Sequence, residues 1–345
     1  MFEPQRAFDT TWLFSPRKES AYGTALADPD LTKHVVASAV EVGKIAKLFR
    51  SDLDRFGKGH EFPTELNELA RDLRRTTTFD ASSLTTAWVC AFALGKVVTS
   101  QPNPGGNPSA YDHLITFADP AVSKHAPTTT VYEELTADLK RRLVSLACND
   151  FSLSGRSHDP VQVAANWVGS GQTVAGALTP LPALTGQSFF LGADTDILLG
   201  PQSAPVSLKD RVLDWSVSVT QNLDADLGYH PGSGKFRGRL WYGPRRVSAA
   251  LTFFAREADD LLALFLNDTI QELRIVLSGD VIGPGPEKHQ AIIKLPAVRL
   301  TAFDDALEGN HIVYRVEINE TGVLKQGSAE PLEITVTNTE PAFLT

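Results

Sequence analysis

The chain has 345 residues, of which 42% are hydrophobic and 21% charged, and this balance excludes an intrinsically disordered protein. Its 32 basic and 41 acidic side chains give a formal charge of -9, which disfavours tight binding of nucleic acid by the surface as a whole. The longest apolar runs are far shorter than the ~20 residues that span a bilayer, so we expect no membrane partner.

Residues 1–30 contain three prolines and show little periodicity, which indicates an irregular N-terminal arm. The large apolar side chains of this arm are Phe2, Phe8, Trp12, Leu13 and Phe14. A free tail rarely carries such a set, so we expect the arm to lie against this subunit or against a neighbouring one.

Residues 34–42 are rich in β-branched side chains and predict the first strand. The following stretch, residues 44–62, is charged and is interrupted by Gly57 and Gly59. It is longer than an ordinary connection between strands, and long loops are usually functional or disordered. We therefore expect either a functional loop or a disordered one here.

Residues 73–79 predict a second strand, and a helix follows it. Its N-cap is expected at Asp80, Ser82 or Ser83, because a side-chain oxygen there accepts a free backbone N–H of the first turn. The residues that then recur at helical spacing are Leu84, Ala87, Trp88, Ala91 and Phe92. Gly95 is expected to end the helix, and we expect one apolar face of the helix to pack against a sheet.

The rest of the chain repeats this plan. Further strands are predicted at residues 111–118, 129–135, 142–153 and 161–168. The second half is predicted to contain a strand at 212–219, a polar glycine-containing segment at 221–238 and a strand at 247–254. A helix is predicted to follow, with Glu257, Asp259 and Asp260 in its first turn, where the helix dipole favours negative charge. The last predicted strands are residues 273–277, 291–303, 311–318 and 332–337.

This order predicts a duplication. We expect an N-terminal arm at residues 1–30, a first domain at 31–170, a linker at 171–207, and a second domain at 208–345 that includes a C-terminal strand. The two thiols, Cys90 and Cys148, lie in apolar segments and are expected to be buried and reduced.

Catalytic and metal-binding patterns are weak. The eight histidines show none of the spacings typical of a metal site. The acidic pairs Asp194 with Asp196 and Asp304 with Asp305 have the chemistry of general acids and bases, but both lie in turn-like sequence. We interpret them as solvated turn residues and predict no catalytic residue, no cofactor, no metal and no enzyme activity. The alternative from the enzyme class is a β-rich hydrolase that uses scattered Asp and His side chains.

Several stretches resemble one known family. Residues 78–99, followed by a loop rich in proline and glycine and by residues 111–117, look like a tail tube (major tail) protein of a long-tailed bacteriophage. Residues 143–155 and 161–171 are similar to the same family, and residues 214–222 extend the resemblance into the second half.

The resemblance implies a mainly β fold with one short helix per half, built as a duplicated β-sandwich or barrel domain. It implies that sheets of neighbouring subunits join into a barrel whose bore carries DNA, and that the rings stack into a tube of the virion. The subunit is then made in the host cytoplasm. The expected partners are further copies of the chain, as a trimer with pseudo-sixfold symmetry or as a hexamer, together with tape-measure, terminator and distal tail proteins. The alternative is a terminator or distal tail protein, which forms a ring that does not polymerise.

In this family a long loop between early strands reaches the adjacent ring. The matching positions here are residues 44–62 and 221–238. The resulting candidates for ring stacking are Phe49, Arg50, Asp52, Asp54, Arg55, Phe56, Asp224, Asp226, Tyr229 and Lys235.

Overall fold

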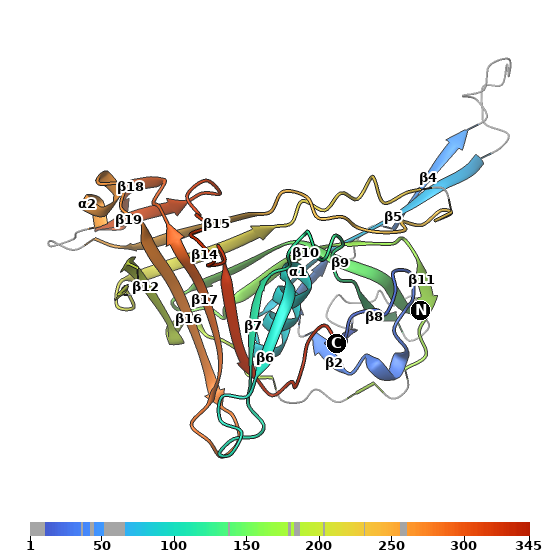
Figure 1. The fold of residues 1–345 in the computed structure, drawn as a ribbon, viewed down its shortest axis with the longest axis horizontal. Helices are drawn as coiled ribbons and strands as arrows, with labels where there is room; N and C mark the ends of the chain where they lie inside the picture. Colours follow the sequence, from blue (N-terminus) through green and yellow to red (C-terminus); the bar gives the residue numbers. More distant parts are fainter. Residues whose placement is uncertain are drawn as a thin grey trace, which may run out of the picture.

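The computed structural model describes residues 11–35, 37–41, 45–51, 66–136, 139–178, 181–182, 187–202, 204–230, 232–255 and 261–345. Strands dominate this part of the chain, and they form two antiparallel sheets with a helix between them (Figure 1). The predicted mainly β fold is therefore confirmed. Within the described residues, no helix combines the length and the apolar character that crossing a bilayer requires.

The larger sheet, here called the large sheet, has eight strands along its main path. In spatial order they are β18 (Ala302–Glu308), β19 (His311–Ile318), β15 (Arg246–Phe254), β14 (Val212–Thr220), β9 (Leu139–Arg156), β10 (Gln162–Gly169), β5 (Leu66–Asp80) and β3 (Ala37–Glu41). Five further strands pair beside this path, namely β1 (Thr11–Phe14), β2 (Lys33–Val35), β4 (Ile45–Ser51), β8 (Thr129–Thr136) and β11 (Thr173–Ala175).

The second sheet, here called the small sheet, has seven strands. In spatial order they are β13 (Val206–Ser207), β12 (Thr195–Pro201), β16 (Gln271–Val281), β17 (Lys288–Val298), β20 (Glu333–Asn338), β7 (Tyr111–Phe117) and β6 (Gly95–Ser100). Both sheets contain strands from both halves of the chain, because β14 pairs with β9 and β20 pairs with β7. Residues 171–207, which we expected to be a linker, include β11, β12 and β13.

The strands follow the alternation that the sequence carries. Along β14, Trp215, Val217 and Val219 are buried, whereas Ser216 and Ser218 between them are only partly buried. Successive side chains of a strand point to opposite faces, so this segment directs its apolar side chains into the space between the sheets and its serines outward.

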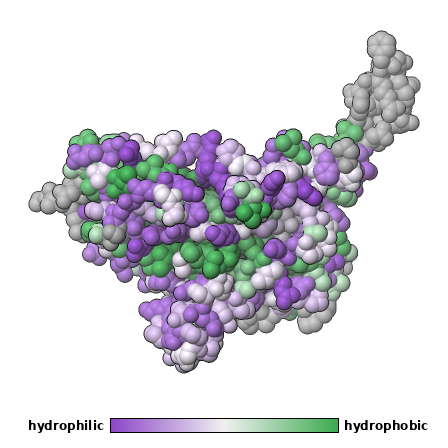
Figure 2. Space-filling view, in the orientation of Figure 1, coloured by the Kyte–Doolittle hydropathy of each residue, from purple (hydrophilic) through white to green (hydrophobic). Residues whose placement is uncertain are grey.

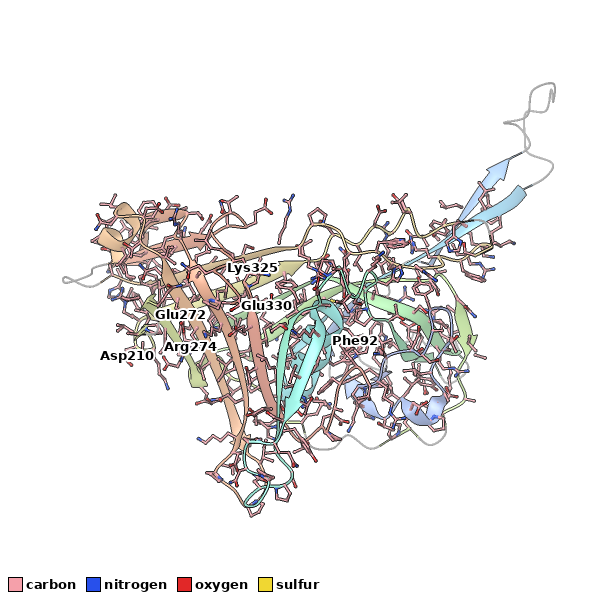
Figure 3. All side chains as sticks on the ribbon, in the orientation of Figure 1. Phe92, Asp210, Glu272, Arg274, Lys325 and Glu330 are labelled. Carbon is pink, nitrogen blue, oxygen red and sulfur yellow. The ribbon has the colours of Figure 1, made fainter. Side chains whose placement is uncertain are left out.

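The helix α1 (Ser83–Leu94) lies between the sheets. Ser82 is its N-cap and forms a capping box with Thr85, and Gly95 ends it with a left-handed φ of 87°, so both predicted ends are confirmed. The prediction that only one face is buried is wrong, because all twelve residues are buried. The helix packs on β9 on one side and on β6, β7 and β20 on another, and Figure 3 labels Phe92 on it within the body of the protein.

The N-terminal arm is more regular than its sequence indicates. Thr11–Phe14 forms β1, which pairs with β2 and β8. Trp12, Leu13 and Phe14 are buried, and Phe14 stacks on Trp88 of α1 with ring centroids 4.2 Å apart. The described part of the arm, from residue 11 onward, therefore lies against its own subunit, which was the first of the two predicted alternatives. Phe2 and Phe8 lie outside the described residues.

The predicted loop at residues 44–62 is in part a hairpin. Ile45–Ser51 forms β4, which pairs with the first part of β5 and projects from the body (Figure 1). A loop was expected because this stretch is charged, but the cross-strand pairing with β5 decides its conformation.

The second helix is short. α2 covers Leu261–Leu266, and the acidic residues predicted for its first turn lie outside the described residues. Both cysteines are buried and unpaired, as predicted.

Candidate assembly surfaces

The outer face of the large sheet carries small side chains, most of which are polar. They are Thr76 and Thr78 on β5, Ala164 and Asn166 on β10, Ser152 and Ser154 on β9, Ser216 and Ser218 on β14, and Ser248 and Ala250 on β15. Each alternates with a buried neighbour, so these residues point away from the core. We call this set the serine face.

The strand register aligns these residues into rows that cross the sheet. One row joins Ser248, Ser218, Ser152, Ala164 and Thr78 on five adjacent strands. None of the five has a long or charged side chain, so this row is flat and carries hydroxyl groups that water can solvate.

A parallel row is polar but bonded within itself. Thr76 Oγ1 donates to Asn166 Oδ1 at 2.6 Å, and Asn166 Nδ2 donates to Asp150 Oδ1 at 2.5 Å. At the end of this row Arg246 pairs with Glu320 at 2.7 Å. The charged side chains beside the serine face, Asp150 and Arg246, are thus bonded to neighbours in the same chain.

The two ends of the large sheet are free edges. No described strand pairs with the outer side of β18 or with the outer side of β3. Leu307 on β18 is 74% exposed, and Ile312, its partner on β19, is 55% exposed. An unpaired edge strand that also exposes apolar side chains is a template on which another strand can pair.

The β4–β5 hairpin presents a second exposed apolar surface. Leu48 and Phe49 on β4 and Leu69 on β5 are each about half exposed, at 51%, 50% and 55%. Figure 2 shows hydrophobic residues at the base of this projection. Of the predicted stacking residues, Phe49 and Arg50 lie on β4, whereas Asp52, Asp54, Arg55 and Phe56 lie outside the described residues.

The predicted loop of the second half packs on the same hairpin. The hydroxyl of Tyr229 donates to the carbonyl of Arg71 at 2.5 Å, and Lys235 Nζ lies 2.9 Å from Glu68 Oε2. The backbone N–H of Arg71 in turn donates to the carbonyl of Lys235 at 2.8 Å. The structure therefore brings Tyr229 and Lys235 to β5, from a point in the sequence about 160 residues away.

The charges at this contact are coupled. Hydrogen bonds from Arg71 and Lys235 lower the pKa of Glu68 to about 2. Arg237 pairs with Asp72 and lies over the ring of Tyr229 at 5.0 Å. Sequence reasoning missed Glu68, Asp72 and Arg237, because nothing local to them indicates a partner so far along the chain.

Asp224 and Asp226 have a different setting. Together with Arg74 and Trp241 they line a surface hollow of about 650 Å³. Asp224 Oδ1 also accepts the backbone N–H of Leu227 at 3.1 Å, which stabilises the turn.

The buried charged groups have structural partners. Glu133 lies 3.5 Å from Arg75 and 2.6 Å from Arg141. Burial raises the pKa of Glu19, and this rise is opposed by hydrogen bonds from Ser145, Thr130 and Thr128. These carboxylates hold strands together, and Glu19 also lines a surface hollow of about 880 Å³.

The acidic pairs considered for catalysis are separate cases. Asp304 and Asp305 lie on the exposed edge strand β18, so the prediction of turn residues is wrong for them. The prediction is also wrong for Asp196, which lies on β12 and accepts a hydrogen bond from Ser207 at 2.5 Å, whereas Asp194 lies in a short 3-10 turn. Within the described parts of the chain, no three His, Cys, Asp or Glu side chains form a group that is able to hold a metal ion.

Comparison with known proteins agrees with this picture of a β-rich protein with exposed sheet edges. No curated protein matches the chain. The family model described as "Phage tail tube protein" matches residues 17–290, which is most of the chain and includes strands of both sheets. The chain belongs to the phage tail tube protein family, whose members are structural components of the virion tail.

Proposed function

We propose that this protein builds the tail tube by self-assembly: copies close into rings, the rings stack, and DNA passes through the bore during ejection. The observation that carries the proposal is the large sheet, which combines two free edges with the serine face. A sheet of this kind becomes stable against random aggregation when its edges pair with those of other copies.

The strand number supports a ring of three chains. Three copies bring twenty-four strands of the main path together, and strands about 4.8 Å apart that tilt by about 40° then form a barrel about 48 Å across between backbones. Two copies form a barrel only about 32 Å across, and the side chains on its walls then leave little room for a duplex. Six copies in one ring are the other arrangement that the family suggests.

The serine face lines the bore in this proposal. Small hydroxyl-bearing residues offer DNA neither a row of cations nor an apolar surface, and the net charge of -9 disfavours adhesion of a polyanion. DNA then moves along the wall without binding to it.

The hairpin provides the contact between rings. Phe49 and its apolar neighbours Leu48 and Leu69 project beyond the body, where an adjacent ring covers them. The tape-measure protein fits the bore of the finished tube, and the terminator and distal tail proteins fit its two ends.

Electron microscopy of the purified protein tests the proposal. We expect hollow tubes of constant diameter that grow with protein concentration. Isolated rings that never elongate would instead favour the terminator or distal tail alternative, and a protein that stays monomeric at high concentration would refute self-assembly.

Replacing Phe49 and Leu69 with serine separates rings from tubes. We expect the variant to keep its secondary structure and to form rings, with tubes at least tenfold less abundant on microscopy grids. Val122, which is 84% exposed in a turn outside both sheets, is the matched control, and Val122→Ser should leave tube growth unchanged. Normal tubes from the Phe49 and Leu69 variant would remove the hairpin from the stacking contact.

A further inference from the structure

Among the described strands, the two halves of the chain meet in the large sheet where β14 pairs with β9. We propose that the junction between neighbouring copies in a ring repeats this one: β3 of one copy pairs with β18 of the next, in the register that β14 and β9 already use. The inference rests on the proposed ring and names, residue by residue, the two strand edges that pair between neighbouring copies.

The strand order of the large sheet supports the repeat. Along the sheet, β18, β19, β15 and β14 are followed by β9, β10, β5 and β3. In each set of four, the strand in third place is followed in the chain by a helix, and the strand in fourth place comes earlier in the chain than the third. The second set is therefore a translated copy of the first, and its free edge β3 corresponds to β14.

A shared irregularity fixes the correspondence at residue level. In β3 and β5 the pairing shifts between Ala37, opposite Phe79, and Ala39, opposite Thr78. In β14 and β15 it shifts between Val212, opposite Phe253, and Asp214, opposite Thr252. Bulges are positional features of a fold, so two bulges at the same place align the strands.

The aligned residues that face the core are alike in type and in burial. Phe79 and Phe253 take the same place, and both are fully buried. From this alignment Ala39 corresponds to Asp214, and Val40, the next residue, corresponds to Trp215.

The same counting aligns the other edge. Thr78 lies opposite Ala164, which lies opposite Ser152. The equivalent Thr252 lies opposite Arg315, which lies opposite Asp304. Ser152 therefore corresponds to Asp304.

Counting onward along both strands, Gly155 corresponds to Leu307, and Arg156 to Glu308. The junction inside the chain places Trp215 opposite Gly155 and Asp214 opposite Arg156. At the junction between copies, Val40 therefore lies opposite Leu307.

By the same register, Ala39 lies opposite Glu308, and Glu41 lies opposite Ala306. No like charges meet at these three positions, which favours the register.

The sizes of the paired residues are complementary in both junctions. Inside the chain the bulky Trp215 covers Gly155, where an added Cβ would lie only 2.7 Å from the indole nitrogen. Between copies the smaller residue, Val40, lies on the β3 side and the larger, Leu307, on the β18 side. In this pairing the neighbouring copy covers Leu307, which is why Leu307 is 74% exposed in the single chain.

Engineered disulfides test the register. We expect the double variant Val40→Cys, Leu307→Cys to form covalent dimers and trimers on mild oxidation of assembled tubes, seen on non-reducing gels and lost on reduction. Cys90 and Cys148 are buried and do not compete. The matched control is Val40→Cys, Glu308→Cys, which is displaced by one residue and directs the two thiols to opposite faces of the sheet.

The outcomes separate this inference from the proposed function. Tubes that form but crosslink only through the displaced pair, or through neither pair, overturn the register and leave the tube function intact. A chain that forms no rings or tubes overturns both.

A second variant covers the case in which the thiols disturb folding. Leu307→Lys places a charge on the edge of β18 without touching the core, and we expect it to raise the protein concentration needed for assembly at least tenfold, at unchanged circular dichroism. Val122→Lys is the exposed control and should assemble as the unmodified chain does. Equal assembly by both variants would contradict a junction at β18.

Discussion

The helices of the two halves occupy corresponding places in the strand order but differ in burial. α1 is buried along its whole length, whereas in α2 only Leu261 is buried, and Leu262 and Leu266 are 45% and 71% exposed. The difference lies in what surrounds them. α1 is covered by the N-terminal strand β1, through the stacking of Phe14 on Trp88, whereas α2 packs at the end of the sheet next to β18, where Phe265 stacks on Phe303 at 5.9 Å.

The comparison teaches that the helix of the first half is fully covered within one chain and that the helix of the second half is not. Both terminal segments close the first half: Phe343 is buried against His113, and the backbone N–H of Leu344 donates to the carbonyl of Pro16 at 2.9 Å. No described segment covers α2 in the same way. In the proposed ring a neighbouring copy takes that place.

The largest expected effect comes from the closed half. Trp88 stacks between Phe14 and Trp167, with ring centroids 4.2 and 4.8 Å away, and is fully buried. We expect Trp88→Ala to lower the free energy of unfolding by about 3–5 kcal/mol, because the transfer energy is lost and a cavity remains. Urea denaturation of the unassembled chain measures it.

The matched substitution in the open half is Leu266→Ala, at a residue that is 71% exposed. We expect it to change the free energy of unfolding of the monomer by less than about 0.5 kcal/mol. A loss as large as that of Trp88→Ala would mean that the two helices are equally embedded and would break the comparison.

The capping of α1 gives an effect between those of Trp88→Ala and Leu266→Ala. The hydroxyl of Ser82 accepts the backbone N–H of Thr85 at 3.1 Å, and the Thr85 hydroxyl accepts the N–H of Ser82 at 3.1 Å. We expect Ser82→Ala to lower the free energy of unfolding by about 1 kcal/mol. Thermal unfolding measures it, and Ser82→Asp, which restores an acceptor, should recover most of the loss. No recovery would show that the lost energy is not that of a cap.

The smallest effect concerns the contact between the loops of the two halves. The pKa of Glu68 is lowered to about 2 from its ordinary value of 4.5, so its contribution is present above pH 4.5 and is lost as the pH falls from 4.5 to 2. Glu68 is only partly buried and lies on the projecting hairpin, so we expect a local loosening of the segment around Lys235 and only a small change in overall stability.

Hydrogen exchange at the amide of Arg71, which donates to the carbonyl of Lys235, reports this contact. After correction for the intrinsic exchange rate, its protection should fall between pH 4.5 and 2, and Glu68→Gln should remove that dependence. A dependence that persists in Glu68→Gln would assign the pH response to another group.

The local features of the fold were predictable from the sequence. The alternation in β14, the cap at Ser82 and the left-handed Gly95 each depend on neighbours in the chain. The strand and Gly95 were located correctly, and the cap is one of the three predicted candidates. The two buried thiols follow from their apolar surroundings in the same way. The surroundings of the candidate stacking residues were harder to predict. The sequence indicated that the two long segments differ from ordinary connections, but not that Lys235 bonds to Glu68 of β5.

The sequence by itself determined that strands would dominate and, to within three candidate N-cap residues, where one helix would begin and end, whereas the duplication of the element order stays a prediction. Only the tertiary structure decided that α1 is buried on every side, that residues 45–51 are a strand, and that β14 joins β9. The physical reason is distance along the chain. Caps and alternation are set by residues a few positions apart, whereas burial and strand pairing depend on which distant segments come to lie beside each other.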